Sequence, residues 1–246
     1  MSGTVLVTGS AGRLGQAAVR ELADRGWFVR GFDLHPTRGA DESIVGDLAD
    51  RAAVSRAMAG VRALVHLAAW PDDDEDFVGR LVPPNIVGVY NVLEAARRER
   101  VPRVVLASSG QVVWRQRFTG PLPIQPSDPP TPRGWYACAK VFAESAGQVY
   151  AYDNDADVIV ARLGWCPRSP EHAAELELTT WAHDVYLSPG DAGRFFGAAL
   201  DGPGPIGFRI AFVTSAPQRE KYVDLSTALE LGYRPQDRYP EGLDLA

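Results

Sequence analysis

The feature that most constrains the fold is the alternation of short apolar runs with amphipathic stretches over the first two-thirds of the 246 residues. The run TVLVTG at 4–9 is followed by a stretch at 13–26 in which Leu14, Ala18 and Leu22 share one helical face. Strands that alternate with helices are typical of βαβ units, which build parallel sheets. The pattern predicts an α/β fold with a Rossmann-type doubly wound parallel sheet.

The alternation continues along the chain. Further strands are expected at 27–33, 43–47, 63–69, 103–109, 157–164 and 208–213, and further helices at 49–60, 85–100, 135–152 and 191–200. Two segments break the rhythm: residues 118–134 carry six prolines between Pro121 and Pro132, and residues 164–188 show little periodicity. Both follow the carboxyl ends of expected strands, where open α/β sheets bind ligands.

This organisation predicts two parts. Residues 1–163 are expected to form an NAD-binding Rossmann domain that also holds the catalytic residues. Residues 164–246 are expected to be a mixed region, which supplies the last Rossmann helix and strand at about 189–213 and a small C-terminal substrate cap.

Composition narrows the classes of function. A net charge of −6 gives no electrostatic footprint for nucleic acid or an anionic membrane, and no apolar run is long enough to cross a bilayer. The start MSGTVLVTGS has no secretory pattern, and Cys138 and Cys166 are interpreted as free thiols. The four histidines have no metal-ligand spacing. We therefore expect a cytoplasmic protein without a metal, whose partner is a small-molecule substrate.

A glycine-rich segment, TGSAGRLG at 8–15, lies between the first strand and the first helix. Gly9 allows a tight turn, Gly12 allows close approach of backbone to a diphosphate, and Gly15 allows helix and strand to pack closely. The N–H groups and dipole of the helix N-terminus favour bound phosphate. An ordinary glycine turn is the alternative, and the position at the first βα junction favours the dinucleotide.

An acidic residue, Asp33, ends the second strand, 18 residues after Gly15. A carboxylate there accepts hydrogen bonds from ribose hydroxyls and repels a 2′-phosphate, so NAD is favoured over NADP. Arg38 is the one nearby feature that favours NADP. Asp47 follows the third strand near the expected adenine site, with a turn or helix-cap role as an equal alternative. Small residues in HLAAW at 66–70 would let the cofactor lie against the fourth strand.

Tyr136 and Lys140 in WYACAK are one helical turn apart and follow Ser109, which ends the fifth strand. Interconversion of an alcohol and a carbonyl needs a proton donor and acceptor beside the carbon that exchanges hydride. Tyrosine can serve near neutral pH when a lysine ammonium and the positive nicotinamide ring stabilise its phenolate. A serine hydroxyl can hold the substrate oxygen, whereas hydride transfer belongs to the cofactor.

These motifs, together with Asn85 ahead of NVLEAA and the pair Ser108–Ser109, resemble the short-chain dehydrogenase/reductase superfamily, in its extended branch of NAD-dependent epimerases and dehydratases. The resemblance implies that Tyr136 is the acid/base and Lys140 its pKa partner and ribose ligand. It implies that Ser109, rather than Ser108, holds the substrate oxygen. Asn85 is assigned to fixing its helix or to a proton relay, with simple packing as the alternative. The implied cofactor-binding residues are Gly9, Gly12, Arg13, Leu14, Gly15, Asp33, Asp47, Leu48, Leu67, Ala68, Ala69, Tyr136, Lys140 and Leu163.

The later segments are similar to the uronate dehydrogenases, which oxidise the anomeric carbon of galacturonate or glucuronate with NAD. The similarity fails at the substrate: Gly110 and Gln111 replace the Asn-His of those enzymes, Trp165 replaces their serine, and Glu175, Leu176 and Glu177 stand where their carboxylate-binding arginine lies. Loss of that arginine opposes a uronate carboxylate. Compensation would have to come from Arg115, Arg162 or Arg168.

Two tryptophans, Trp114 and Trp165, come from different loops that flank the expected site. Our interpretation is that they make a flat apolar pocket suited to a cyclic or aromatic ketone or alcohol, with packing of the cap as an equal alternative. The substrate-binding residues are thus Ser109, Gly110, Gln111, Trp114 and Trp165.

Three classes of function follow. The favoured class is an NAD-dependent oxidoreductase that acts on CH–OH groups. A sugar or sugar-nucleotide epimerase or dehydratase with retained NAD is the first alternative, and a non-catalytic dinucleotide-binding regulatory protein is the second. The family resemblance also implies a homodimer through the helices at 85–100 and 135–152.

Overall fold

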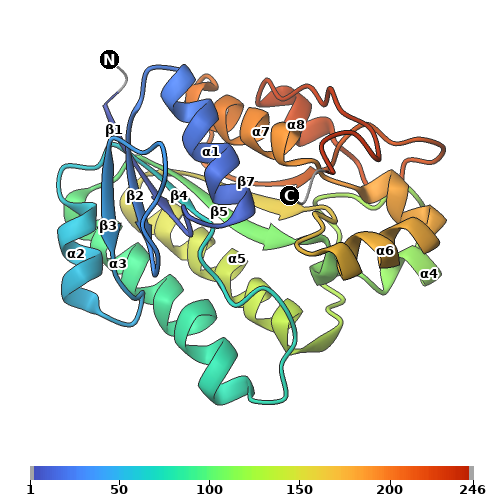
Figure 1. Cartoon of the computed structure of the whole chain (residues 1–246), viewed down its shortest axis with the longest axis horizontal. Coiled ribbons are helices and arrows are strands. Elements are labelled where there is room, and N and C mark those ends of the chain that lie inside the picture. The colour runs from blue at the N-terminus through green and yellow to red at the C-terminus, as the bar shows by residue number, and fades with distance from the viewer. Residues whose placement is uncertain (1–2, 244–246) are drawn as a thin grey trace.

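The chain folds into a seven-stranded parallel sheet with helices on both faces (Figure 1). The computed structural model describes residues 3–243. The strand order is β3-β2-β1-β4-β5-β6-β7. The strands are β1 Thr4–Thr8, β2 Phe28–Asp33, β3 Glu42–Val45, β4 Ala63–His66, β5 Arg103–Ser109, β6 Asp157–Leu163 and β7 Phe208–Val213. The prediction of a doubly wound Rossmann-type sheet is confirmed.

The helices fill the connections between the strands. The α-helices are α1 Arg13–Asp24, α2 Arg51–Met58, α3 Val89–Glu99, α4 Gln116–Thr119, α5 Gly134–Asn154, α6 Pro170–Leu178, α7 Pro189–Asp201 and α8 Ser226–Glu230. Shorter turns of other type are η1 Phe77–Leu81, η2 Pro83–Gly88, η3 Gly110–Val113 and η4 Thr180–Val185.

The central strands are buried on both faces, which explains why their sequences read as continuous apolar runs rather than as alternating ones. On one face α1 and α7 pack together, with Leu22 and Phe195 in a shared core. On the other face α2, α3 and α5 cover a second core that contains Leu64 and Val92. Two apolar layers thus hold the sheet in the middle of the molecule.

The order of the strands places a crevice at the carboxyl ends of β1 and β4. From β1 the chain first runs outward through β2 and β3, then returns to β4 on the other side of β1 and continues to β7. Connections that leave in opposite directions open a gap between the helices they carry, and ligands of such sheets bind there.

Some helices differ from the sequence-based expectation. The helix expected to begin at residue 85 is preceded by π-helical turns from Phe77 onward. Pro83 and Pro84 lack the N–H that an α-helix requires, which accounts for the irregular ladder. The region 164–188, expected to have little periodicity, contains α6, which begins at Pro170 with Ser169 as its cap. The Ser-Pro-Glu start is a helix signal that the weak apolar periodicity concealed.

The last third of the chain contributes to both the sheet and the ligand-binding edge. The strand β7 completes the sheet, and α7 and α8 pack in the core beside it, whereas residues of α6, of η4 and of the segment that leads to α8 line the cavity at the carboxyl ends of the strands. The boundary at residue 163 between a nucleotide-binding domain and a mixed region stays a prediction.

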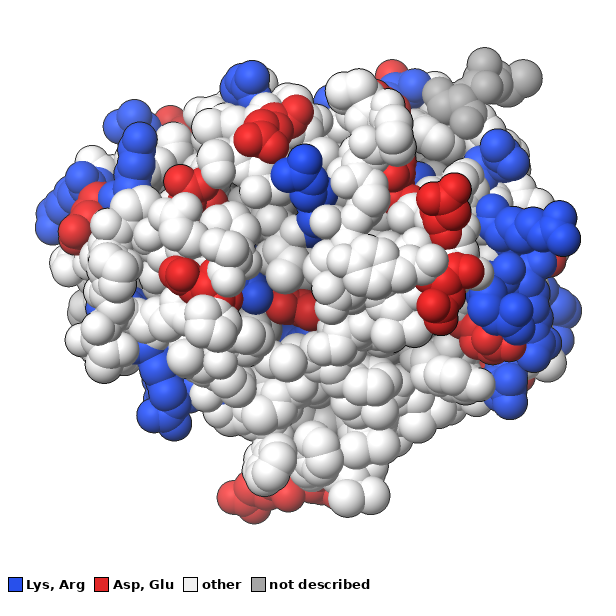
Figure 2. All heavy atoms as spheres, turned by 180° about the vertical axis from the view of Figure 1, so that it is seen from behind, with Lys and Arg blue, Asp and Glu red and all other residues white. Residues whose placement is uncertain are grey.

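The surface carries both signs of charge. On the face in Figure 2, acidic and basic side chains lie side by side around a largely uncharged centre, with basic groups gathered at one edge. Within residues 3–243, no helix is both long and apolar enough to cross a bilayer.

Candidate active site

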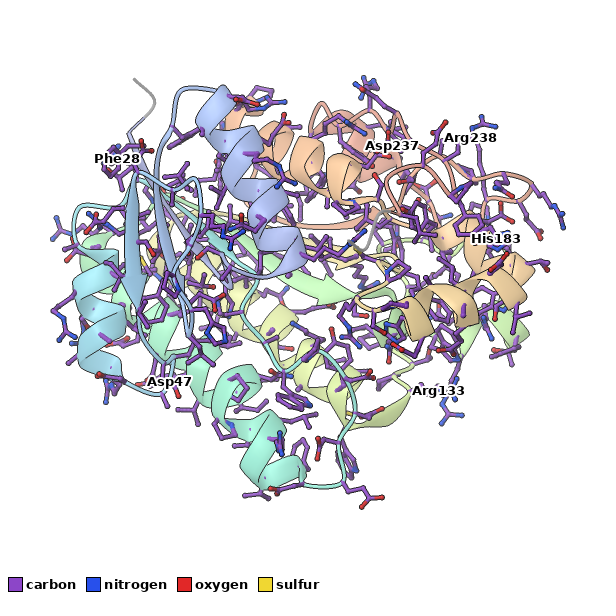
Figure 3. The ribbon with its side chains drawn as sticks, in the orientation of Figure 1. Phe28, Asp47, Arg133, His183, Asp237 and Arg238 are labelled. Atoms are coloured by element: carbon purple, nitrogen blue, oxygen red, sulfur yellow. The ribbon has the colours of Figure 1, made fainter. Side chains whose placement is uncertain are left out.

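One cavity of about 880 Å³ lies at the carboxyl ends of the strands, and every residue predicted for cofactor, catalysis and substrate lines it. It extends from Asp47, beside α2, to Arg133, at the start of α5, which lie far apart across the molecule (Figure 3). Loops that are distant in the sequence meet here because parallel strands end at the same edge of the sheet.

The glycine loop after β1 has the geometry of a dinucleotide turn. Gly9 has φ of +70°, and a Cβ there would lie 2.6 Å from the backbone nitrogen of Ala68. A Cβ on Gly15 would collide with the carbonyl of Gly9, so only glycine allows α1 to approach β1 this closely. Gly12 caps α1 without a side-chain hydrogen bond. The N-terminal amides of α1 therefore remain available to an anion in the cavity.

The ribose end of the cavity is marked by Asp33. Its carboxylate accepts hydrogen bonds from the backbone N–H groups of Ala11 (3.1 Å) and His35 (3.1 Å), which fix its position at the end of β2. Carboxylate oxygens have further lone pairs that can accept ribose hydroxyls. Arg38, the feature that favoured NADP, is exposed and does not line the cavity.

Asp47 serves as a turn residue and still faces the cavity. Its Oδ1 accepts a hydrogen bond from the N–H of Ala49 at 2.8 Å, whereas Asp50 caps α2. Leu48 packs beside it, and its carbonyl accepts a hydrogen bond from buried Asn91 at 2.8 Å. A turn role for Asp47 is therefore compatible with a position beside the cofactor. Together the turn, the amides of α1, Asp33 and this apolar end fit NAD.

The predicted acid/base group lies in the middle of the cavity. Ser109 lies close enough to the Tyr136 hydroxyl to lower its pKa, and the Nζ of Lys140 lies 5.6 Å from the centre of the Tyr136 ring. The ammonium of Lys140 donates to the carbonyl of Ala107 at 3.0 Å. Burial lowers the pKa of Lys140 to about 8. The structure thus brings the serine, tyrosine and lysine into one cluster.

The pKa of Tyr136 depends on several neighbours. Burial raises it to about 12, and the negative charges of Asp72 and Asp73 add to that rise. The positive charge of Arg168 and the Ser109 hydrogen bond act in the opposite direction. Arg168 was considered in the sequence only as a substitute for a missing carboxylate-binding arginine. In the structure its positive charge lies near Tyr136 and favours the phenolate form of that side chain.

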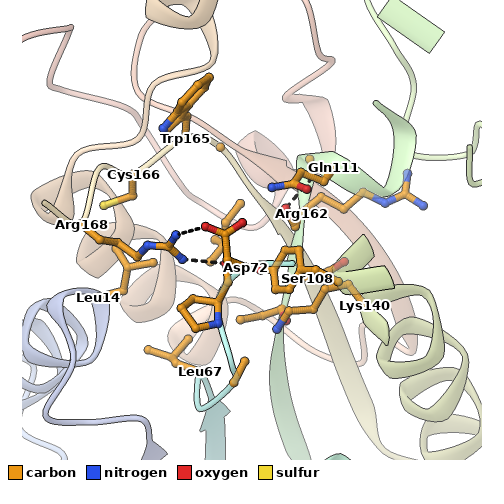
Figure 4. A pocket seen from close by; sticks show the side chains of 18 of the residues that line it. Leu14, Leu67, Asp72, Ser108, Gln111, Lys140, Arg162, Trp165, Cys166 and Arg168 are labelled. Atoms are coloured by element: carbon orange, nitrogen blue, oxygen red, sulfur yellow. Dashed lines mark hydrogen bonds and ion pairs between the residues drawn. The ribbon is translucent and has the colours of Figure 1, made fainter. Parts of the chain in front are cut away.

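A bridge crosses the cavity between the loops that follow β4 and β6 (Figure 4). Arg168 donates to the carboxylate of Asp72 at 2.7 Å and to the carbonyl of Pro71 at 2.6 Å. Asp73, the next residue, accepts a hydrogen bond from the backbone N–H of Tyr136 at 2.7 Å. The acidic run at 72–76 therefore contacts the first turn of α5.

Asn85 ties the same loop to the helix that follows it. It is 2% exposed, accepts from the N–H of Trp70 at 2.7 Å and donates to the carbonyl of Trp70 at 3.0 Å. Both ends of its amide are thus used by one residue of the loop after β4. The structure supports the fixing role among the alternatives considered for Asn85.

The two adjacent serines point to different surroundings. Ser108 is buried and donates to Glu144 at 2.6 Å, and Glu144 pairs with buried Arg162 at 2.9 Å. This network joins β5, α5 and β6 beneath the cavity. Ser109 instead lies at the Tyr136 hydroxyl. The preference for Ser109 as the substrate-oxygen donor is consistent with this division.

His66 is a buried neighbour that sequence reasoning did not single out. Its Nδ1 is 2.7 Å from the hydroxyl of Thr8, and its Nε2 has no hydrogen-bond partner among the described residues. Burial, and then the charge of Lys140, lower the pKa of His66 to about 3. The imidazole is therefore neutral, and it adds no positive charge beside Lys140.

The far end of the cavity is aromatic. Trp114 and Trp165 line it as predicted, and Trp181, which was not predicted, packs against both with ring centres 5.2 and 6.1 Å apart. The guanidinium of Arg117 lies over the rings of Trp114 at 3.9 Å and Trp181 at 3.6 Å. The contacts of Trp181 with Trp114 and Arg117 join segments more than sixty residues apart, so no local pattern in the sequence could reveal them.

The three arginines proposed as substitutes for the missing carboxylate ligand are engaged elsewhere. Arg162 pairs with Glu144, Arg168 pairs with Asp72, and Arg115 donates to the carbonyl of Pro132 at 3.4 Å. Gly110 and Gln111 form the 3₁₀ turn η3 beside Ser109. Within residues 3–243, no cluster of three or more histidine, cysteine or acidic residues could hold a metal ion.

The chain is similar to known proteins over most of its length. Residues 5–165 match the NAD dependent epimerase/dehydratase family. The chain is 30% identical to an L-arabinose 1-dehydrogenase (NAD(P)(+)) of Haloferax volcanii, covering 95% of this chain and 96% of that protein. It is also 30% identical to a uronate dehydrogenase of Pseudomonas putida, covering 95% and 84%.

A solved structure shares the fold over nearly the whole chain. A mutant uronate dehydrogenase from Agrobacterium tumefaciens, complexed with NAD, has a TM-score of 0.78 and 29% identity, and the match covers 95% of this chain and 84% of the other. The similarity therefore extends beyond the nucleotide-binding half into the region after residue 163.

Proposed function

The chain belongs to the NAD-dependent epimerase/dehydratase family, and we propose that it interconverts an alcohol and a carbonyl on a small cyclic substrate. The observation that carries this proposal is the cluster of Ser109, Tyr136 and Lys140 in a cavity that also contains the glycine loop. The relatives named as dehydrogenases are similar over most of their length, and they support the same type of reaction. NAD is the cofactor, and Asp33 favours it over NADP.

The residues of this chain divide the work as follows. Ser109 holds the substrate oxygen by donating its hydroxyl, and Tyr136 removes the proton of that oxygen during oxidation or returns it during reduction. Arg168 and Lys140 supply positive charge that favours the phenolate. NAD, when bound, accepts or returns the hydride. The amides of α1 would hold its diphosphate, and Asp33 its ribose.

The substrate proposed is a ring compound that lies against the aromatic end of the cavity. Trp114, Trp165 and Trp181 form its walls, and flat rings pack well on such surfaces. Our sequence-based interpretation was a cyclic or aromatic alcohol or ketone. The cavity supports the ring shape, but Arg117 makes the wall at Trp114 cationic rather than purely apolar.

Two alternatives have definite tests. A sugar or sugar-nucleotide epimerase or dehydratase would retain NAD and produce no net NADH. A regulatory dinucleotide-binding protein would keep its cellular effect after Tyr136→Phe. The position of Tyr136 beside Ser109 favours a catalytic role over the regulatory, dinucleotide-binding alternative.

The testing experiment is formation of NADH by purified protein with a panel of ring substrates: D-galacturonate, D-glucuronate, L-arabinose, D-glucose 6-phosphate, cyclohexanol and benzyl alcohol. At least one should give many NADH per protein chain. Tyr136→Phe should lower kcat by about 100-fold or more without changing the melting temperature. No NADH from any substrate, or full activity in Tyr136→Phe, would contradict the proposal.

We further propose a cytoplasmic homodimer. The helix α5 exposes Phe142, Val149 and Tyr152, which recur at spacings of seven and three residues and so share one face. Tyr90 on neighbouring α3 is also exposed, at 53%. An apolar face of this kind, on the helices already expected to form the interface, supports self-association.

A further inference from the structure

Arg117 is a cation at the aromatic end of the cavity, and among the described residues it has ring contacts but no hydrogen-bond or ion-pair partner. Its Nε and Nη1 are buried and make no hydrogen bond with any described residue, and it forms no ion pair within residues 3–243. Buried guanidinium groups are normally paired, because an unpaired charge removed from water is costly. The covered N–H groups of this half-buried side chain leave hydrogen-bonding capacity for a ligand in the cavity.

Aromatic rings fix the guanidinium in place. It lies 3.9 Å from the centre of the Trp114 ring, 3.6 Å from that of Trp181 and 4.2 Å from that of Phe118. Stacking on aromatic faces orients the plane of a guanidinium but leaves its N–H groups unused, because those lie in the plane of the group. An arginine held in this way is preorganised to bind a planar or tetrahedral anion at its edge.

The surroundings add positive charge. Arg133 also lies over the Trp114 ring, 5.4 Å from its centre, and lines the cavity. Burial, and then the charge of Arg133, lower the pKa of Arg117, whereas Tyr222 acts in the opposite direction. Two carboxylates of the cavity, Asp72 and Asp73, are already bound to Arg168 and to the N–H of Tyr136. Glu175 also lines the cavity and makes no ion pair among the described residues.

We propose that Arg117, held between Trp114 and Trp181, is an anion-binding residue of the substrate site, so that the preferred substrate is a cyclic alcohol that carries a carboxylate or a phosphate group. This inference rests on the proposed function. The anion would be bound by α4, which follows β5. The segment at 175–177, where uronate dehydrogenases carry their carboxylate-binding arginine, has two glutamates in this chain. The aromatic walls bind the ring, and Arg117 binds the charged substituent.

Binding can be tested without turnover. Tyr136→Phe protein saturated with NAD is titrated with compounds that differ mainly in charge, with tryptophan fluorescence and calorimetry as readouts. The comparisons are D-glucuronate and D-glucose 6-phosphate against D-glucose, and benzoate against benzyl alcohol. We expect at least one anion to bind about 10- to 100-fold more tightly than its neutral counterpart. Preference for glucuronate or benzoate identifies a carboxylate, and preference for glucose 6-phosphate identifies a phosphate.

Substitution of the arginine separates this role from packing. Arg117→Gln in the same background should abolish the preference for the anion while leaving binding of the neutral compound within about twofold. Arg117→Lys should restore part of the preference. Lys221→Gln removes an exposed positive charge that lies outside the cavity and should change nothing. Melting temperatures of all variants show whether the aromatic cluster remains folded.

Two outcomes overturn the inference: anions that bind no more tightly than their neutral counterparts, and a preference that persists in Arg117→Gln. Neither outcome depends on NADH formation. Failure of the proposed function, seen as absent turnover in the unmodified protein, is therefore a separate result.

Discussion

At the scale of single residues, the environment of Tyr136 decides when it can act as a base. The tyrosine is half-buried, desolvation raises its pKa to about 12, and Arg168 is the nearby cation that counters this rise. Lys140 lies below the ring, and its main contact is the carbonyl of Ala107. The sequence predicted the tyrosine and lysine from their spacing. It did not predict Arg168, because the loops carrying Arg168 and Asp72 are brought together only by the fold.

Replacement of Arg168 should change the pH dependence of oxidation. Arg168→Gln removes a positive charge that stabilises the phenolate, so the pKa of Tyr136 rises and the acidic limb of the kcat profile moves to higher pH. Asp72→Asn removes a negative charge that raises the same pKa and should move the limb to lower pH. Profiles of kcat against pH, measured with saturating NAD, check both. Shifts in the same direction would contradict this account.

Replacement of Asp33 should change the choice of cofactor. Asp33→Ser removes the carboxylate that repels a 2′-phosphate, so the ratio of kcat/KM for NAD over NADP should fall by about tenfold or more. Arg38→Gln is the control, since Arg38 is exposed and outside the cavity. It should leave the ratio unchanged. A ratio that depends on Arg38 and not on Asp33 would show that the ribose lies elsewhere.

At the scale of elements, the strongly periodic segments were predictable and the irregular ones were not. The strands and the helices α1, α5 and α7 follow from continuous apolar runs and helical spacing. The glycine turn followed from residues whose conformation only glycine allows. The short helix α4 and the π-helical turns before α3 were missed, because prolines and tertiary contacts shape them. Arg117 belongs to one of these segments, so its place at the cavity was hidden too.

The buried network of Ser108, Glu144 and Arg162 should hold the catalytic helix against the sheet. Glu144→Gln leaves the Arg162 charge unpaired inside the protein and should lower the free energy of unfolding by about 3–5 kcal/mol. Urea denaturation measures this change. Glu230→Gln, which affects an exposed pair with Arg209, should have little effect. A Glu144→Met/Arg162→Met double variant should be less destabilised than the sum of its single variants.

At the scale of the whole molecule, helix α5 takes part in both the ligand chemistry and the proposed self-association, at different positions along its length. Tyr136 and Lys140, in its first two turns, line the cavity, whereas the exposed Val149 and Tyr152 lie toward its C-terminal end and do not line it. Dimer formation and catalysis are therefore expected to be separable.

A charge on the exposed stripe of α5 should give a monomer. Val149 is 59% exposed, and Val149→Glu places a carboxylate in the proposed interface. Sedimentation velocity should show a dimer for the unmodified protein and a monomer for the variant, with an unchanged circular dichroism spectrum. Leu178→Glu, at a site on α6 that is 87% exposed, is the control and should remain dimeric. A monomeric unmodified protein would remove this proposal.

The central claim is that this chain carries out net hydride transfer to NAD by means of Tyr136. The most direct measurement uses the best substrate of the panel, deuterated at the carbon bearing the hydroxyl group that is oxidised. After many turnovers, mass spectrometry should find reduced cofactor in solution that is one mass unit heavier, in amounts equal to the carbonyl product. Tyr136→Phe should form both products about 100-fold or more slowly. Deuterium that returns to the substrate or its epimer, with NAD retained on the protein, would contradict the claim.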